Sequence, residues 1–259
     1  MQLNDFVAMM QGIAPNELSM GYDNVGLLIG PESKDIKKVL VALDCSTITA
    51  EEAIRLNCEL MLTHHPVFFH GAKRISLDDP ATAGAYMLMR AGIGLYAAHT
   101  NLDNARGGVN HRLARALGLT PIAPLAPIDD AGNGGGLLAE CPEAMAPMDM
   151  LAHIRRVLGC TSLHYAEGPQ RPIRRVALCG GAGESLMEAA LQSGADLFLT
   201  GEMGYHRYFG HEDEILIGVL GHYQSEQFTI QLMQRILHEA LPDLRTVVTS
   251  ENTNPIHTV

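Results

Sequence analysis

The chain has 259 residues, which is enough for one large domain or two modest ones. Apolar residues make up 47% of the sequence and charged residues 18%, a composition typical of globular proteins, so disorder is excluded as the main state. The formal net charge of −11 argues against a general nucleic-acid-binding surface, whereas an acidic chain with twelve histidines is compatible with bound divalent cations.

The five cysteines are scattered along the chain and include no Cys-x-x-Cys pair, so neither a disulfide framework nor a thiolate zinc site is indicated. The N-terminal residues lack the pattern of a secretory signal peptide, and no run of eighteen apolar residues occurs in the sequence. We therefore expect a cytoplasmic protein with reduced thiols and no membrane partner.

The first half of the chain alternates between predicted strands and helices. Val and Leu dominate residues 37–44, a short apolar run typical of a buried strand, and apolar residues then recur at helical spacing over 47–57. Further strands are predicted over 58–66 and 92–99, and further helices over 80–91 and 107–119. This order indicates an α/β layer with a largely parallel sheet.

Residues 121–147 are rich in Pro and Gly and have little periodicity, so we expect a linker or an irregular entrance to a second lobe, with the boundary between two lobes inside it. A helix is predicted over 148–158, and a second strand, helix and strand follow over 174–202. Two more predicted strands flank a long helix, with the strands at 215–221 and 244–250 and the helix at 225–241.

The two halves of the chain resemble each other over one strand, helix and strand. When VALDC…AEEAI…ELMLTHH is laid over VALCGG…LMEAA…DLFLTGE, Val41 falls on Val176 and His65 falls near Glu202. We therefore predict two related α/β lobes with mostly parallel sheets. The first is formed by residues 1–125 together with about 240–259, and the second by about 126–239.

Four clusters of polar residues stand where predicted strands end. The carboxyl ends of parallel strands meet at one edge of a sheet, where short loops and helix N-termini converge, so these clusters are candidates for one site. They are His64 with His65, His99 with Asp103, Glu202 with His206, and His222 with Glu226. Imidazole nitrogens and carboxylate oxygens suit transition metals, and carboxylates can bridge two cations. The sequence therefore points to a metal site.

Each cluster also has a simpler structural explanation. Adjacent histidines on a regular strand point to opposite faces, but Pro66 turns the backbone. His64 and His65 therefore either reach metal together or make backbone hydrogen bonds in a loop. His222 and Glu226 are four residues apart and can share the first turn of a helix, either as ligands or as a cap beside a surface imidazole.

Three other features are less specific than these clusters. Asp44 is expected mainly to cap the helix that follows it, and Asp23 either belongs to a loop or faces the same cleft as the histidines. The glycine-rich turn at 179–185 either binds an anion or lets a helix and a strand pack closely, and the second is favoured because the turn lacks the Lys-Ser/Thr of a P-loop. No G-x-S-x-G motif is present, which disfavours serine catalysis.

Five segments together resemble the NIF-three-like family of dinuclear-metal proteins, whose members are often named GTP cyclohydrolase I type 2 homologues. The segments are DNVGLLIG, LTHHPVFF, AHTNLDNARGGVN, TGE with the following His, and GHYQSE. The resemblance runs from about residue 5 to the final strand. It implies two divalent metal ions in the cleft between two α/β lobes, with the ligands His64, His65, Asp103, His222 and Glu226.

The resemblance further implies that His99 beside the metals and His206 in the same cleft act in catalysis, and that the chain is the short form of a hexameric ring. The implied reaction is a metal-dependent hydrolysis that opens the imidazole ring of the guanine of GTP and releases formate. The same ligands would serve a phosphohydrolase or nuclease, and a ring that binds metal or a partner without turnover is a third alternative. The metal is left open among Zn, Fe, Mn and Ni.

Overall fold

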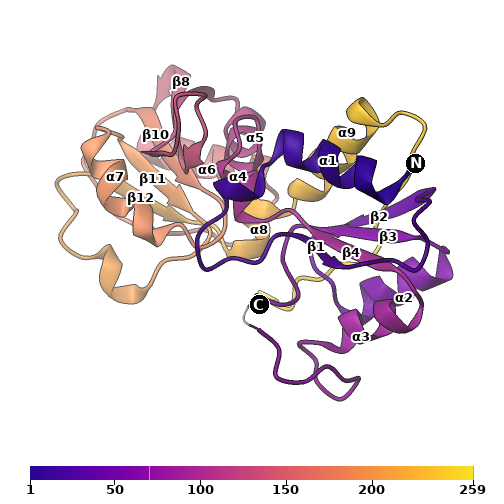
Figure 1. Ribbon diagram of the computed structural model, residues 1–259. Coiled ribbons are helices and arrows are strands. Elements are labelled where there is room, and N and C mark those ends of the chain that lie inside the picture. The colour runs from indigo at the N-terminus through magenta and orange to yellow at the C-terminus, as the bar shows by residue number, and fades with distance from the viewer. Residues whose placement is uncertain (70, 259) are drawn as a thin grey trace. The chain divides into compact units, whose positions relative to one another are not determined.

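The computed structural model describes residues 1–69 and 71–258 (Figure 1). The chain divides into two compact units. Unit 1 comprises Met1–Leu102 and Thr229–Pro255, and unit 2 comprises Asp103–Phe228 and Ile256–Val259. Each unit has its own sheet with helices on both faces, so each is a layered, mixed α/β structure.

Unit 1 is built on a five-stranded sheet in the order β1-β4-β3-β2-β13. Four of its strands run parallel, namely β2 (Lys38–Ala42), β3 (Leu60–Thr63), β4 (Gly94–Ala97) and β13 (Arg245–Val248). The fifth, β1 (Gly26–Ile29), pairs antiparallel with β4 at one edge. The central strands are almost continuously apolar because both faces of a parallel sheet are covered.

Helices cover both faces of the unit 1 sheet. In Figure 1, α2 (Thr47–Arg55) and α3 (Ala83–Arg90) lie on one face, and α1 (Leu3–Ile13) and α9 (Thr229–Ala240) lie on the other. Leu40 of β2 packs with Ala50 of α2 and Leu88 of α3 in one apolar cluster. Val39 and Val41 alternate to the opposite face and are also fully buried.

Unit 2 contains a six-stranded sheet in the order β5-β8-β10-β11-β12-β9. Its parallel centre consists of β10 (Ile173–Cys179), β11 (Leu197–Thr200) and β12 (Leu216–Val219). Antiparallel strands complete it, namely β5 (Thr120–Ala123), β8 (Leu137–Met145) and β9 (His164–Ala166). The short strands β6 (Ala126–Pro127) and β7 (Gly134–Gly135) form a separate pair.

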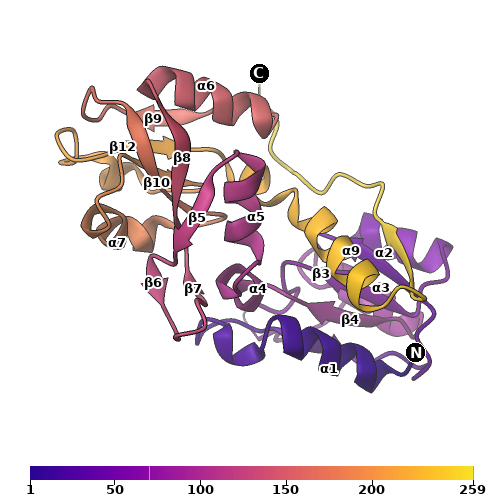
Figure 2. The same ribbon diagram turned by 90° about the horizontal axis from the view of Figure 1, so that it is seen from above.

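The helices of unit 2 also lie on both faces of its sheet. Figure 2 shows α6 (Pro147–Val157) on one side and α7 (Met187–Gln192) on the other, and α5 (Val109–Ala116) packs in the same apolar cluster as α6. Two helices of a single turn carry candidate site residues, α4 (Thr100–Asn104) and α8 (His222–Glu226). Short 3₁₀ turns occur at η1 (Asn16–Leu18), η2 (Glu184–Leu186) and η3 (Tyr205–Tyr208).

The predicted repeat is confirmed by the strand topology. In unit 1, β2 leads through α2 to the adjacent parallel strand β3, and β4 follows in parallel beside it. In unit 2, β10 leads through α7 to β11, and β12 follows in the same way. Each sheet then ends in an antiparallel edge strand, β1 beside β4 and β9 beside β12.

The expectation of a linker over 121–147 is wrong, because this segment contributes strands to the second sheet. β8 is nine residues long and pairs with both β5 and β10. Pro142 obscures the pattern, since proline cannot donate to a β-ladder. It lies where the β8–β10 register shifts, between the pairs Glu140–Arg175 and Met145–Ile173.

The single helix predicted over 225–241 is two helices, α8 and α9. Gln227 and Phe228 separate them, and Phe228 packs against the apolar cluster of unit 2. The next residue, Thr229, begins the part of the chain that belongs to unit 1, where α9 packs on β13 and β2. The break therefore coincides with the passage of the chain from one unit to the other.

The predicted lobe boundaries near 125 and 240 are also displaced, and the units instead meet along the chain at 102/103 and 228/229. The segment 103–125 belongs to unit 2 because β5 pairs with β8 and α5 packs on the same sheet. The α9 segment belongs to unit 1 because it covers β2 and β13. Within residues 1–69 and 71–258, no helix is both long and apolar enough to cross a membrane.

Candidate metal centre

His64 and His65 occupy the end of β3, directly after the buried Thr63. The backbone N–H groups of both histidines donate to the carbonyl of Leu43, over 3.2 Å and 2.9 Å. The hydroxyl of Thr63 donates to the carbonyl of His65 over 2.9 Å. These bonds turn the chain out of the strand, so the two rings lie on the same side with their centroids 5.0 Å apart.

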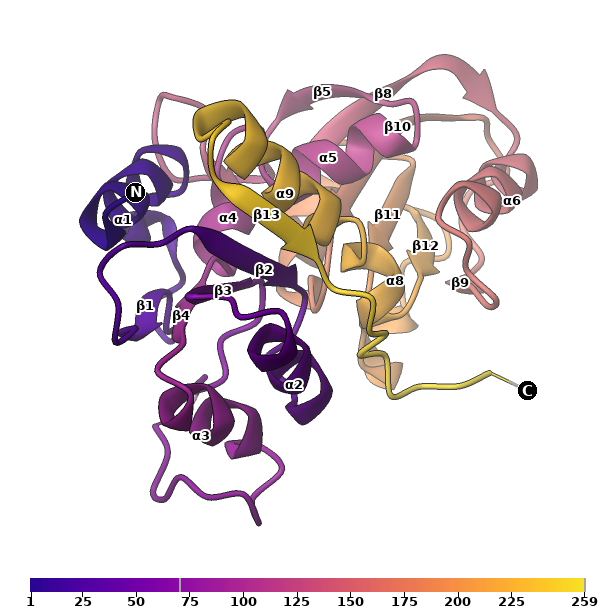
Figure 3. The same cartoon turned by 90° about the vertical axis from the view of Figure 1, so that its right-hand side faces the viewer.

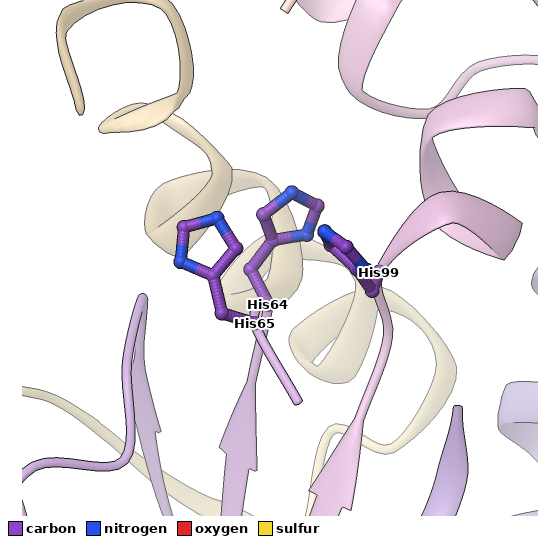
Figure 4. Close-up of side chains that lie close together, drawn as sticks. All are labelled: His64, His65 and His99. Carbon is purple, nitrogen blue, oxygen red and sulfur yellow. The ribbon is translucent and has the colours of Figure 1, made fainter. Parts of the chain in front are cut away.

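His99 follows β4 and joins this pair. Its ring centroid lies 5.2 Å from that of His64 and 5.5 Å from that of His65. Figure 4 shows the three rings gathered beyond the ends of the strands, and one ring nitrogen from each lies within 4.8 Å of the others. Unit 1 alone therefore brings together three of the histidines that the sequence singled out.

The Nδ1 atoms of His64 and His65 both face oxygen acceptors. Nδ1 of His64 lies 2.8 Å from the carbonyl oxygen of Ala98, and Nδ1 of His65 lies 2.6 Å from Oδ1 of Asp44. Carbonyl and carboxylate oxygens only accept hydrogen bonds, so each Nδ1 carries the proton. In the neutral ring the lone pair is then on Nε2, which is the arrangement typical of metal-binding histidines.

Asp44 was expected mainly as a helix-capping residue, but its side chain orients His65. The cap of α2 is Ser46, which forms a capping box with Thr49, and Asp44 contributes only its backbone carbonyl to the Thr49 hydroxyl. The hydroxyl of Thr253 donates to the second carboxylate oxygen, Oδ2. Burial alone would raise the pKa of Asp44, but the hydrogen bonds from His65 and Thr253 outweigh it and lower the pKa.

Asp23 plays the same part for His99. Both of its carboxylate oxygens lie within 3.0 Å of His99 Nδ1, and Oδ2 also accepts from the backbone N–H and the hydroxyl of Thr100. Its side chain is fully buried. Burial would raise the pKa of Asp23, but the hydrogen bonds from His99 and Thr100 more than compensate and lower it to about 2. Asp23 therefore lies in a loop and holds its carboxylate beside the imidazole of His99.

In unit 2, His222 and Glu226 lie on one face of α8, as the four-residue spacing predicts. Nε2 of His222 is 3.1 Å from Oε2 of Glu226, whose side chain is buried. Nδ1 of His222 is 3.1 Å from Oε1 of Glu202, which follows β11. Glu202 thus stands against Nδ1 of His222 as Asp44 stands against Nδ1 of His65.

The glycine-rich turn after β10 packs against Glu226. Gly181 has a positive φ of 62°, and a Cβ added there would lie 2.4 Å from Oε1 of Glu226. Its N–H donates to the hydroxyl of Ser225 over 2.9 Å. The turn therefore packs closely against the α8 carboxylate, a contact that neither interpretation of the sequence pattern anticipated.

Asp103 is tied to the same turn by Asn110, which the sequence did not single out. The side-chain amide of Asn110 donates to the backbone carbonyl of Asp103 over 3.1 Å, and its Oδ1 accepts from the N–H of Gly180 over 3.0 Å. Asn110 is 1% exposed. Asn110 is the last residue of the AHTNLDNARGGVN segment, but the resemblance did not assign it a role.

The comparisons with known proteins agree with the resemblance. Residues 1–255 match the family described as Duf34/NIF3 (NGG1p interacting factor 3). The chain belongs to the NIF3 family. It is 34% identical over 260 residues to a "GTP cyclohydrolase 1 type 2 homolog" of Clostridium perfringens, with 98% of each chain covered. It is 31% identical to "NIF3-like protein 1" of Drosophila melanogaster, over 96% of this chain and 87% of that one.

Among solved structures, a hypothetical protein of Staphylococcus aureus has a TM-score of 0.90 at 25% identity. That comparison covers 100% of this chain and 99% of the other. Together with the family match over residues 1–255, this shows that the mixed α/β fold predicted from the sequence is the fold of the NIF3 family.

The residues present in this NIF3 protein suit a divalent transition metal. Unit 1 offers imidazoles whose protonated Nδ1 atoms are held by acceptors, and unit 2 offers the buried carboxylate of Glu226 beside an imidazole. Neutral nitrogen donors together with anionic oxygens match the preferences of Zn, Fe, Mn and Ni, and they do not single out one of these.

His206 lies in a different setting from the other singled-out histidines. It belongs to η3, is exposed, and has its ring 5.2 Å from the ring of Tyr205. Tyr205 in turn lies 5.2 Å from the ring of Phe209, and both are strongly exposed. Met203 and Tyr208 pack against the unit 2 core and anchor this aromatic segment.

Proposed function

We propose that this NIF3 protein is a dinuclear-metal hydrolase of the GTP cyclohydrolase I type 2 kind. In this proposal His64, His65, Asp103, His222 and Glu226 are the ligands of two divalent ions. The observation that carries it is the contact of Nδ1 of both His64 and His65 with an oxygen acceptor, which leaves the lone pair of each neutral ring on Nε2. The acceptor of His64 is a backbone carbonyl, as it would also be for a loop histidine, so the grouping of three histidine nitrogens within 4.8 Å is the second support for metal.

Two divalent ions, when bound, supply an acidified water and polarise the bond under attack. The chain's own proton carrier is His99. Its Nδ1 is held by Asp23, so Nε2 is the atom that accepts or returns a proton, and the buried Asp23 carboxylate stabilises the ring when it becomes cationic. Asp23 also fixes the orientation of the ring, because it is itself held by Thr100.

The proposed substrate is GTP. In the proposed reaction two waters hydrolyse the two bonds between C8 and nitrogen in the guanine imidazole ring, C8 leaves as formate, and the freed amine closes a new ring with ribose carbons to give a pterin. The name of the Clostridium relative supports this substrate class. His206, Tyr205 and Phe209 support it independently, because three neighbouring exposed rings offer flat faces on which a purine can stack. Arg207 on the same turn is exposed and can bind a phosphate of GTP. This local positive charge offsets the repulsion between a triphosphate and a chain of net charge −11.

The reaction is tested with the metal-loaded full chain and GTP, by assaying formate, a fluorescent pterin after oxidation, and inorganic phosphate. The proposal predicts formate with pterin, lost in Glu226→Gln and kept in the matched surface variant Glu239→Gln. Release of phosphate from GTP with the guanine ring intact would contradict the cyclohydrolase proposal and indicate a phosphohydrolase. If the protein binds two metals but forms no product from GTP or from a nitrophenyl phosphate, it is a metal-binding ring without turnover.

The proposal includes a cytoplasmic homohexamer, as the family resemblance implies. The proposal predicts that sedimentation equilibrium will give the mass of six chains of 28.0 kDa each. A monomer mass at micromolar concentration would contradict the ring.

A further inference from the structure

The C-terminal segment that follows β13 runs past the candidate ligand His65. Residues 249–255 contain no helix or strand, and Figure 3 shows the chain leaving the end of β13 as an irregular coil with several bends. β13 is parallel to β2, so it leaves the sheet at the edge where β2 ends. Asp44 stands just beyond the end of β2, and the segment therefore begins on the side of the sheet that carries the histidines.

Glu52 of α2 anchors the start of this segment. Its carboxylate accepts from the hydroxyl of Thr249 and from both the backbone N–H and the hydroxyl of Ser250, the last over 2.7 Å. Glu52 is only 4% exposed, and its charge is compensated by these bonds together with Arg55, whose Nη2 lies 3.6 Å from Oε1. A buried carboxylate that takes most of its hydrogen bonds from one irregular segment holds that segment in place.

Thr253 makes the second attachment. Its hydroxyl donates to Oδ2 of Asp44, while Oδ1 of the same carboxylate accepts from Nδ1 of His65 over 2.6 Å. A carboxylate bonded at one oxygen can still rotate about its Cβ–Cγ bond, whereas one bonded at both oxygens cannot rotate without losing a bond. The plane of Asp44, and with it the direction of the His65 ring, is therefore fixed from two sides.

We propose that residues 249–255 form a C-terminal strap that positions His65 for metal, with Thr253 as the positioning residue acting through Asp44. The inference rests on the proposed function, in which His65 is a metal ligand. Replacing the partner of a metal-binding histidine typically weakens metal affinity about 10- to 100-fold. Thr253 acts one residue further out, and we expect roughly a 3- to 10-fold loss when its hydroxyl is removed.

The test compares zinc affinity, measured by competition with a chelator, in four forms of the full chain. They are the wild type, Thr253→Val, Thr253→Ser, and the control Thr258→Val, which removes a tail hydroxyl that is bonded to Thr161 instead. Thr253→Val should bind zinc 3- to 10-fold more weakly, while Thr253→Ser and Thr258→Val should match the wild type. The imidazole nitrogen NMR signals of metal-free protein should show one Nδ1–H tautomer for His65 in the wild type and a mixture in Thr253→Val.

Three outcomes would overturn the strap. They are unchanged zinc affinity and tautomer in Thr253→Val, an equal loss in Thr258→Val, and no recovery in Thr253→Ser. If the wild type itself binds no zinc, the proposed function is wrong. The tautomer measurement then tests by itself whether Thr253 orients His65 through Asp44. Equal melting temperatures of the metal-free variants separate a positioning effect from a general loss of stability.

Discussion

Replacing Gly181 by alanine tests whether the turn after β10 sets the position of Glu226. The added Cβ would lie 2.4 Å from Oε1 of Glu226, and ordinary contact begins at 3.4 Å, so the carboxylate oxygen must move by about 1 Å. Metal–ligand distances tolerate changes of only ~0.2 Å. We therefore expect Gly181→Ala to lower zinc affinity by at least about tenfold.

Alanine at this position also costs backbone energy, and a matched control isolates that cost. Gly181 has a φ of +62°, where an L-residue is strained by about 1 kcal/mol. Gly159 has the same φ of +62° but nothing within 4 Å of an added Cβ. Both variants should lose about 1 kcal/mol of unfolding free energy in urea, and only Gly181→Ala should lose zinc affinity. Equal zinc affinity in the two variants would refute the close approach of turn and ligand.

Three further outcomes are expected. The low pKa of Asp23, about 2 against an ordinary 3.8, means that its hydrogen bonds stabilise the fold fully above pH 4 and lose this effect as the pH falls toward 2. Between pH 5 and 2 the wild type should therefore lose roughly 2 kcal/mol more unfolding free energy than Asp23→Asn, measured by denaturation followed by circular dichroism, and parallel losses would contradict it. Tyr205→Ala removes a 72% exposed ring, so the melting temperature should hold while the KM for GTP rises about tenfold, and an unchanged KM would remove Tyr205 from the substrate site. Phe198→Ala empties a fully buried position in unit 2 and should cost about 3–5 kcal/mol in urea unfolding, whereas a loss below 1 kcal/mol would show that the core collapses around it.

Much of the fold follows from local pattern, because β2, β3 and β4 are short apolar runs separated by amphipathic helices. The proximity of His64 to His65 and of His222 to Glu226 could be predicted in the same way, because strand ends and helix turns place such residues together. The β8 strand could not be predicted, because Pro142 and the exposed second half of the strand interrupt the pattern of apolar residues. The break between α8 and α9 could not be predicted because the helical periodicity of the sequence continues through it. What changes at Thr229 is the unit against which the chain packs.

The groups that orient the histidines were the least predictable part of the site. Thr253 and Asp44 are 209 residues apart in sequence, and the acceptor for His64 is a backbone carbonyl, which has no sequence signature. Asp44 did carry a signal, since a carboxylate directly after a parallel strand lies at the same edge as the histidines. The sequence favours a capping role for Asp44 because Ser46 follows it closely, but Ser46 and Thr49 form the cap without the Asp44 side chain.

The central claim is that the chain holds two divalent ions through ligands from both halves of its sequence. Its most direct test is elemental analysis of the chain after loading with zinc, iron, manganese or nickel and extensive dialysis, with Glu226→Gln and the exposed-helix control Glu239→Gln treated in parallel. The account predicts about two ions per chain in the wild type and in Glu239→Gln, and clearly fewer in Glu226→Gln. No retained metal in the wild type, or two ions in all three proteins, would contradict it.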